Sequence, residues 1–187
     1  MDDFLPQRMA EMAEAAFPSV ESRDWKHYES EGGKKLEMAD YARMPKALQE
    51  VVHYVNRTPR GLFGFDDLFP DHALYGGGLN MARPGDFLKP HADFNWNDEL
   101  KAYRTVNLIL YLNRDWREEW GGVLDLNGER VLPTFNRAVA FVTRTDAVHG
   151  YGPVTGPVPR KSIGFYFYRK APADGVAVEP HRTLWAA

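Results

Sequence analysis

The chain contains no cysteine among its 187 residues. Structural disulfides, thiolate zinc sites, iron–sulfur clusters and a cysteine nucleophile are therefore excluded. A chain of this length buries roughly 70% of the surface that it would expose when unfolded, so its core needs no covalent or metal staple. The absence of cysteine is compatible with a cytoplasmic location, which we predict.

Clustered charge and long apolar runs are also missing. The formal net charge is −3, and lysine and arginine form no stripe, so we predict no nucleic-acid partner. No apolar run approaches the roughly 18 residues of a membrane span, so we predict no membrane association. The first residues, MDDFLPQRMAEMAEAAF, carry charges throughout and do not fit a secretory signal peptide. The sequence leaves the oligomeric state open.

Two amphipathic helices are predicted in the first third of the chain. The first covers residues 4–17, where six apolar side chains recur at helical spacing: Phe4, Leu5, Met9, Met12, Ala16 and Phe17. The second begins after Pro45, because proline is favoured in the first turn. Its apolar stripe consists of Leu48, Val51, Val52 and Val55. The polar, glycine-bearing stretch 29–35 between the two helices is predicted to be a loop.

From about residue 75 onward, short apolar runs bounded by turn residues predict strands. The runs cover residues 105–113, 122–127, 129–133, 138–143 and 161–168. Between two of them lies the dipeptide Asn127-Gly128, a strong signal for a two-residue hairpin. Short strands after a helical beginning, without alternation of strand and helix, predict a mainly β (α+β) jelly roll.

The domain organisation predicted from this pattern is simple. We expect one domain over residues 1–187, because no linker, repeat or low-complexity segment interrupts the chain. Its parts are a helical support in residues 1–73, a β-rich catalytic core in residues 74–170 and a C-terminal tail in residues 171–187.

His91, Asp93 and His149 provide the donors of a 2-His-1-carboxylate metal site. In the tripeptide HAD the first two lie two residues apart, so on an extended strand both side chains point to the same face. His149 follows the apolar run 138–143, where a side chain can turn into a cavity. This donor set holds iron(II) and leaves positions open for oxygen and a co-substrate. Taken singly, the HAD pair fits a surface ion pair equally well, and His149 fits a core histidine.

A basic residue follows the second histidine. Arg160 lies 11 residues after His149, and Ser162 lies two residues further on the same strand face. A guanidinium binds a carboxylate bidentately, and each charge-assisted hydrogen bond contributes about 1.5–3 kcal/mol. The pair can therefore anchor a dicarboxylate that lies on the metal. Alone, Arg160 is more simply a solvated charge on an edge strand; its position after the triad favours the anchor.

Together these motifs resemble the catalytic core of the iron(II)/2-oxoglutarate-dependent oxygenases, specifically the prolyl-4-hydroxylase-like branch. The resemblance is carried by RPGDFLKPHADF (83–94), RTVNLILYLNRDW (104–116), WGGVLDL (120–126), VHG (148–150) and RKSIGFYFY (160–168). It implies a double-stranded β-helix, the jelly-roll architecture of cupins. It also implies that His91, Asp93 and His149 bind iron(II).

The resemblance further implies a binding site for 2-oxoglutarate. Arg160 would form a salt bridge with the distal carboxylate of this co-substrate, and Tyr111 would contact the same carboxylate. Ser162 can donate a further hydrogen bond. Relatives often carry a tyrosine before the glycine turn, where this sequence has Asn80. We predict that Asn80 substitutes for that tyrosine as a donor.

The implied reaction uses O2 as oxidant and couples decarboxylation of 2-oxoglutarate to hydroxylation of an unactivated C–H bond, with release of succinate and CO2. The carboxylate of Asp93 favours hydroxylation over halogenation, because related halogenases carry a small residue there. The expected substrate is a prolyl residue or a small amino-acid-derived molecule, and the short chain favours a compact one. We predict that residues 94–103, including Trp96, form part of a substrate lid. Tyr166, on the strand face of Arg160, is predicted to line the pocket.

Two other functions stay open at this point. A cupin-type metalloenzyme could use the same triad without 2-oxoglutarate, and a non-catalytic jelly-roll module could retain the metal site. Arg160, Ser162 and Tyr111 count against the first alternative, and the complete ligand set counts against the second. Release of succinate would distinguish the oxygenase from both.

Overall fold

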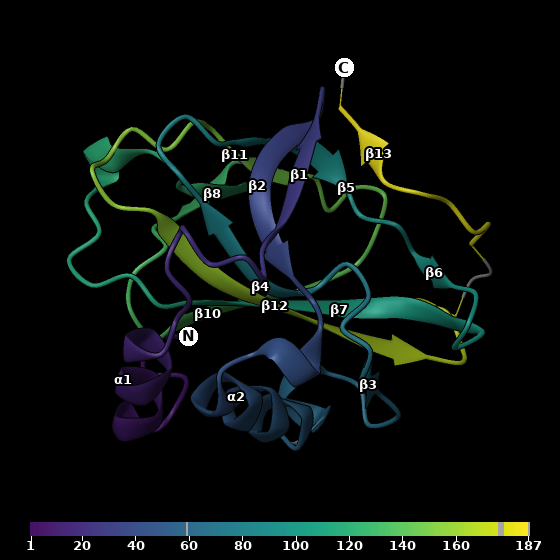
Figure 1. Ribbon diagram of the computed structural model, residues 1–187. Coiled ribbons are helices and arrows are strands. Elements are labelled where there is room, and N and C mark those ends of the chain that lie inside the picture. The colour runs from purple at the N-terminus through teal and green to yellow at the C-terminus, as the bar shows by residue number, and fades with distance from the viewer. Residues whose placement is uncertain (59, 176–177, 187) are drawn as a thin grey trace.

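The computed structural model describes residues 1–58, 60–175 and 178–186 (Figure 1). The two α-helices in these ranges are α1 (Gln7–Ala15) and α2 (Lys46–Asn56). The short 3-10 helices are η1 (Tyr41–Arg43), η2 (Arg60–Phe63) and η3 (Glu118–Trp120). No helix in the described ranges has both the length and the apolar character needed to cross a membrane.

Thirteen strands of the described residues join in one sheet. They are β1 (Lys26–Ser30), β2 (Gly33–Met38), β3 (Phe69–Pro70), β4 (Gly78–Ala82), β5 (Leu88–Ala92), β6 (Trp96–Asn97), β7 (Ala102–Tyr111), β8 (Leu124–Leu126), β9 (Glu129–Val131), β10 (Arg137–Val142), β11 (His149–Tyr151), β12 (Arg160–Arg169) and β13 (Leu184–Trp185). The main order is β10-β7-β12-β4-β2-β5-β11-β8-β9, with β1 on β2, β3 on β12, β6 on β7 and β13 on β5.

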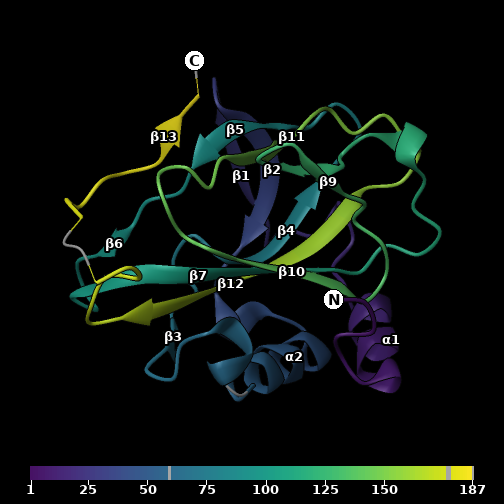
Figure 2. The ribbon, with the colours of Figure 1, turned by 180° about the vertical axis from the view of Figure 1, so that it is seen from behind.

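The sheet folds over on itself to make two layers. Figures 1 and 2 show β10, β7 and β12 in the lower layer and β5, β11 and β8 in the upper one, with β2 and β4 running between them. Every strand pairing is antiparallel, and β7 and β12 pair along most of their ten residues each. This architecture is the double-stranded β-helix, so the predicted fold class is confirmed.

The two helices pack under the lower layer (Figure 1). In α2 the predicted stripe is confirmed, because Leu48, Val51, Val52 and Val55 are all buried. In α1 the predicted stripe is partly wrong. The buried face of α1 is formed by Ala10 and Ala13, whereas Met12 is 47% exposed. Small side chains there let the short helix lie close to α2, and the larger apolar residues Leu5 and Phe17 are buried just outside its ends.

The loop predicted for residues 29–35 was wrong. The segment contains the turn of an antiparallel hairpin and the strand ends beside it, and β1 pairs with β2 from Lys26 opposite Glu37 to Ser30 opposite Gly33. The side chains of β1 are mostly exposed, so the strand lacks the apolar alternation that marks a half-buried one. Its order comes from pairing with β2, which in turn pairs with β4.

The predicted β-hairpin at Asn127-Gly128 is confirmed. Leu126 pairs with Glu129, and both turn residues have the positive φ angles, 52° and 86°, that a tight hairpin needs. The five predicted runs overlap β7, β8, β9, β10 and β12. Gly78 explains how closely β4 approaches the end of β2, because a Cβ there would lie 2.5 Å from the carbonyl oxygen of Met38.

Candidate functional site

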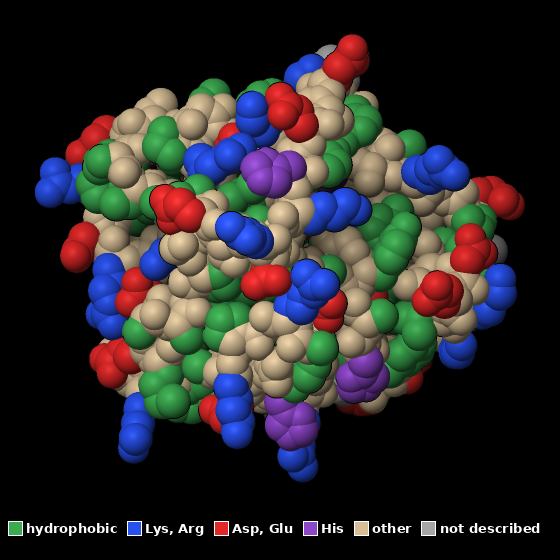
Figure 3. Space-filling view, in the orientation of Figure 1, with side chains coloured by type: hydrophobic (Ala, Val, Ile, Leu, Met, Phe, Trp, Pro, Cys, Tyr) green, Lys and Arg blue, Asp and Glu red, His purple; other side chains and the backbone are tan. Residues whose placement is uncertain are grey.

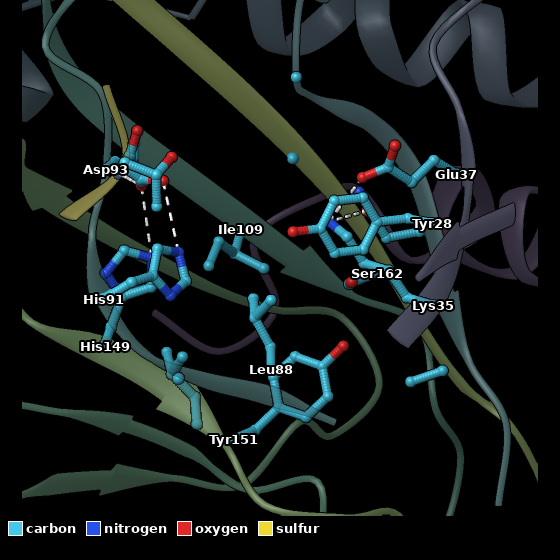
Figure 4. A pocket seen from close by; sticks show the side chains of 18 of the residues that line it. Tyr28, Lys35, Glu37, Leu88, His91, Asp93, Ile109, His149, Tyr151 and Ser162 are labelled. Atoms are coloured by element: carbon cyan, nitrogen blue, oxygen red, sulfur yellow. Dashed lines mark hydrogen bonds and ion pairs between the residues drawn. The ribbon is translucent and has the colours of Figure 1, made fainter. Parts of the chain in front are cut away.

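His91 and His149 are cross-strand partners. His91 lies near the end of β5, and His149 begins β11 directly opposite it. Their ring centroids are 4.5 Å apart. Asp93 follows β5, with its two carboxylate oxygens 3.5 Å from His91 Nε2 and 3.3 Å from His149 Nε2 (Figure 4). One ligand atom from each residue lies within 4.8 Å of the others, so the structure brings together the three residues predicted to bind the metal.

Both imidazoles are oriented by the backbone. His91 Nδ1 lies 2.8 Å from the carbonyl oxygen of Lys89, and His149 Nδ1 lies 3.0 Å from that of Ala147. Because a carbonyl oxygen only accepts, each Nδ1 carries the proton and each Nε2 presents its lone pair to the centre of the triad. This is the arrangement that metal-binding histidines use.

Asp93 is held by two donors on β7, a strand of the other layer of the sheet. Its Oδ2 accepts from Arg104 Nη2 at 2.8 Å and from Asn107 Nδ2 at 2.7 Å. Arg104 Nε also donates to Asn107 Oδ1 at 2.6 Å, which fixes both donors. Burial opposes ionisation of Asp93, but the charge of Arg104 and the hydrogen bond from His91 outweigh it and hold the pKa of the carboxyl well below its usual value. The carboxylate is therefore charged and fixed in direction.

Burial and the nearby Asp93 carboxylate shift the pKa of His149 in opposite directions. Loss of solvation lowers the pKa of the imidazole, against the Asp93 carboxylate that raises it. The neutral form, which is the form that binds metal, is favoured. His149 therefore offers a neutral nitrogen donor to a metal, and Asp93 offers an anionic oxygen donor.

Arg160 lies at the other end of the same cavity, at the start of β12. Its side chain is buried, and its Nε donates to the carbonyl oxygen of Gly122 at 2.7 Å. Its Nη2 donates to the Tyr111 hydroxyl at 3.3 Å, and its Nη1 lies 3.5 Å from Ser162 Oγ. No carboxylate pairs with Arg160 in the part of the chain that the structure describes. A buried cation without a counter-charge is costly, so this end of the cavity fits an anion.

The tyrosines around Arg160 keep their protons. Burial raises the pKa of Tyr111, against the lowering effect of the Arg160 charge. Burial likewise raises the pKa of Tyr151 to about 12, and its ring lies 4.2 Å from the Arg160 guanidinium carbon. Neutral hydroxyls at this place can donate to a carboxylate.

Asn80 is already bonded within the protein. On β4 it lies opposite both Ser162 of β12 and Glu37 of β2. Its Nδ2 donates to the carbonyl oxygen of Gly78 at 3.0 Å, and its Oδ1 accepts from Lys35 Nζ at 2.8 Å. Lys35 also pairs with Glu37 at 3.0 Å. Both ends of the Asn80 amide are thus used within the protein, and the charged group beside it is the ammonium of Lys35. The role of Asn80 as a donor to the co-substrate stays a prediction.

A cavity of about 200 Å³ connects the two ends. Figure 4 shows the triad on one side and Ser162, Lys35 and Glu37 on the other, with the apolar side chains Leu88 and Ile109 between them. In Figure 3 the surface is hollowed between the β1–β2 hairpin and the strands β6 and β13. A small molecule that enters here reaches the triad.

The two residues predicted for the substrate differ in placement. Tyr166 lines the cavity, where its ring lies 3.3 Å from the guanidinium carbon of Arg104 and its hydroxyl donates to the carbonyl oxygen of Gly76 at 2.7 Å. Trp96 is not among the lining residues. Its indole packs edge-on against Tyr103 and donates to Asp98. From the predicted lid segment, Phe94 is the side chain that reaches the cavity.

Several residues of the site escaped the sequence interpretation. Arg104 and Asn107 carried a readable signal, because polar residues within an otherwise apolar strand need a buried partner. Lys35 and Glu37 had none, since they lie at the edge of a segment that was interpreted as a loop. Trp185 belongs to the C-terminal tail, whose pairing with β5 is a long-range contact.

Comparison with protein families gives one match. Residues 77–168 match the family described as the 2OG-Fe(II) oxygenase superfamily. No protein of the curated set matches this chain in sequence.

Solved structures share the fold at low identity. A prolyl-4-hydroxylase from Pseudomonas putida has a TM-score of 0.70 and 19% identity, with 90% of each chain covered. A prolyl hydroxylase from Trichoplax adhaerens, in complex with a peptide fragment of the hypoxia inducible factor oxygen degradation domain, has a TM-score of 0.66 and 16% identity, with 91% of this chain and 82% of that one covered. HygX from Streptomyces hygroscopicus, with nickel, 2-oxoglutarate and hygromycin B bound, has a TM-score of 0.57 and 10% identity, with 90% and 81% covered.

Proposed function

Because the chain belongs to the 2OG-Fe(II) oxygenase superfamily, we propose that it hydroxylates an unactivated C–H bond of a prolyl residue or of a small amino-acid-derived molecule, with release of succinate and CO2. As a member of this superfamily the chain is a dioxygenase that uses iron(II) and 2-oxoglutarate. The substrate class and the assignment of roles to individual residues are our proposal.

The observation that carries the proposal is the spacing of two complementary groups in one cavity. At one end His91, Asp93 and His149 converge to within 4.8 Å, and this donor set suits iron(II). At the other end Arg160 is buried without a carboxylate partner among the described residues. A dicarboxylate can chelate the metal through one end and neutralise Arg160 with the other.

The bound iron, 2-oxoglutarate and O2 supply the oxidation, and the protein supplies binding, orientation and the exclusion of water. Arg160, Ser162 and Tyr111 would orient the distal carboxylate of 2-oxoglutarate. Asn107 and Arg104 would keep the Asp93 carboxylate aimed at the metal. The apolar side chains of Leu88 and Ile109 line the space between and would limit the entry of water.

The substrate would lie toward the hollow in Figure 3. Tyr28, Lys35 and Glu37 of the β1–β2 hairpin line the cavity, so charged and polar contacts are available to a molecule that carries amino or carboxylate groups. The neighbours with the same fold include one with a peptide bound and one with hygromycin B bound. Both a peptidyl and a small-molecule substrate are therefore compatible with this architecture.

A cupin-type metalloenzyme that uses the triad without 2-oxoglutarate is the second candidate. It leaves the unpaired charge of Arg160 without an explanation. A non-catalytic binding module likewise leaves unexplained why the donors on Asp93 and the Nδ1 contacts of both histidines are complete.

The experiment is an anaerobic titration of 2-oxoglutarate into protein loaded with iron(II). We expect a metal-to-ligand charge-transfer band in the visible spectrum, absent in His149→Ala and weakened in Arg160→Ala. Free amino acids and prolyl peptides would then be screened by succinate release. A wild-type protein that binds iron but gives no band would contradict the proposal and favour the metal-only enzyme.

A further inference from the structure

We propose that the C-terminal segment 178–186 is an integral part of the active site, and that Trp185 closes the substrate side of the cavity over His91. Trp185 is thereby a specificity-determining residue, which limits the site to a compact substrate. The inference rests on the proposed function, because it takes His91 to be a ligand of the iron. No feature of the sequence pointed to this segment.

The segment joins the sheet at the metal-binding strand. In β13, Leu184 lies opposite Ala92 and Trp185 lies opposite His91 of β5. The backbone N–H of Ala186 donates to the carbonyl oxygen of Pro90 at 2.9 Å, which extends the contact beyond the strand. The ring centroids of Trp185 and His91 are 4.9 Å apart. Trp185 and Thr183 both line the cavity.

Trp185 also reaches the opposite rim of the opening. A Cβ added to Gly32, in the turn of the β1–β2 hairpin, would lie 2.5 Å from the indole ring. Only glycine leaves room for the ring at this distance. The indole therefore spans from the metal-binding strand to the hairpin, across the side from which a substrate would enter.

Asn95 fastens the segment to the core. Its side chain is buried and uses both ends of the amide, because Nδ2 donates to the carbonyl oxygen of Glu179 at 3.0 Å and Oδ1 accepts from the N–H of His181 at 2.8 Å. The backbone N–H of Asn95 also donates to the carbonyl oxygen of His181. A buried amide whose bonds go to one peripheral segment holds that segment in a defined position.

The consequence concerns the class of substrate. Extended peptides commonly bind to sheets by adding a strand to a free edge, and beside His91 that edge is taken by the chain's own β13. The cavity of about 200 Å³ must also hold 2-oxoglutarate, so the space left for a substrate beside Trp185 is smaller than this. This favours a free amino-acid-sized molecule over a long peptide.

Access to the metal is the quantity to measure. Iron(II)-loaded protein is mixed anaerobically with the bulky chelator ferrozine, and the rate of iron removal is followed by absorbance over a range of chelator concentrations. We expect Trp185→Ala to raise the chelator-dependent rate by roughly tenfold, since a local opening exposes a site that closure otherwise shields from solvent. Trp185→Phe should stay close to the wild type.

Leu184→Ala is the matched control. Leu184 is the neighbouring residue of the same strand and is 45% exposed, so its loss should leave the rate unchanged. If Trp185→Ala does not fold, Asn95→Ala tests the same closure, because it keeps the indole but removes the side-chain hydrogen bonds that fasten the segment. Equal rates in the wild type and the Trp185 or Asn95 variant would overturn the inference.

Binding of 2-oxoglutarate separates the two proposals. The charge-transfer titration should give the same affinity in Trp185→Ala as in the wild type, because Arg160 lies at the other end of the cavity. No band in the wild type would count against the proposed function. A normal band in both proteins, with equal rates of iron removal, would count against the role of Trp185 alone. A loss of 2-oxoglutarate affinity in Trp185→Ala would also contradict a role confined to the substrate side.

Discussion

The two sides of the cavity are built from different kinds of structure. On the co-substrate side, Arg160, Ser162 and Tyr111 lie on the long central strands β7 and β12 and are at most 4% exposed. On the substrate side, the walls come from the β1–β2 hairpin and from β13, where Trp185 is 42% exposed. On our proposal this difference separates two tasks: the buried core would hold the groups that every turnover needs, and peripheral segments would select what enters, as loops and edges on rigid scaffolds often do.

The largest effect is expected at the metal, which serves both sides. His149→Ala removes one of three donors and should weaken iron(II) binding by more than about 100-fold, beyond the loss that an outer hydrogen-bond partner causes. Isothermal titration under anaerobic conditions measures it. His72→Ala is the control, since His72 is exposed and lies outside the cavity. Unchanged affinity in His149→Ala would contradict the ligand assignment.

Arg160→Ala is expected to weaken the binding of 2-oxoglutarate without affecting the metal site. We expect the affinity for 2-oxoglutarate to fall by about 100-fold, because a buried charge-assisted pair is worth several kcal/mol, while iron binding persists. The control is Lys161→Ala, whose ammonium faces away and bonds Glu14 at 3.0 Å. If both variants bind 2-oxoglutarate equally well, Arg160 is not its anchor.

Asn107→Ala tests the support behind Asp93. The substitution removes one of the two donors on Asp93 Oδ2, so iron(II) affinity should fall by about 10-fold or somewhat more. The charge-transfer band should still form once enough iron is supplied. A loss of 2-oxoglutarate binding at saturating iron would show that Asn107 acts on the co-substrate instead.

Lys35→Met changes the wall of the cavity that the β1–β2 hairpin forms opposite the triad. For an amino acid or prolyl peptide that the wild type turns over, we expect kcat/KM to fall by roughly 10-fold through the loss of a polar contact, with 2-oxoglutarate affinity nearly unchanged. Lys34→Met is the matched control, because the neighbouring lysine faces outward and pairs with Glu29 at the surface. A selective loss of 2-oxoglutarate affinity would instead place Lys35 on the co-substrate side.

The smallest effect is a pH dependence of stability from Tyr111. Burial raises its pKa above the usual tyrosine value of about 10, so between the unfolded and the folded pKa the native state holds a proton that the unfolded state has lost. The free energy of unfolding should therefore fall as pH rises above 10, with at most about 1.4 kcal/mol per pH unit from this group. Denaturant unfolding of Tyr111→Phe should show a shallower fall. Tyr41→Phe, which alters an exposed ring, should match the wild type.

The central strands could be predicted from the sequence, whereas the peripheral segments could not. The strands β7 and β12 and the hairpin at Asn127-Gly128 follow from local apolar patterns and turn residues, and His91, Asp93, His149 and Arg160 stand out by residue type and spacing. The β1–β2 hairpin and β13 were missed because their order comes from distant pairing partners, not from an apolar pattern of their own. The single-domain organisation and the cytoplasmic location stay predictions.

The cross-strand pairing of His91 and His149 has a thermodynamic consequence. β5 and β11 share a short and irregular ladder, with a register shift between His149 and Tyr151. An ion bound by both histidines would act as a reversible cross-link between β5 and β11, in a chain that has no cysteine for a disulfide. By mass action, iron at 100 times its dissociation constant would add about 2.7 kcal/mol to the free energy of unfolding. The lifetime of the fold in a cell would then follow the supply of iron.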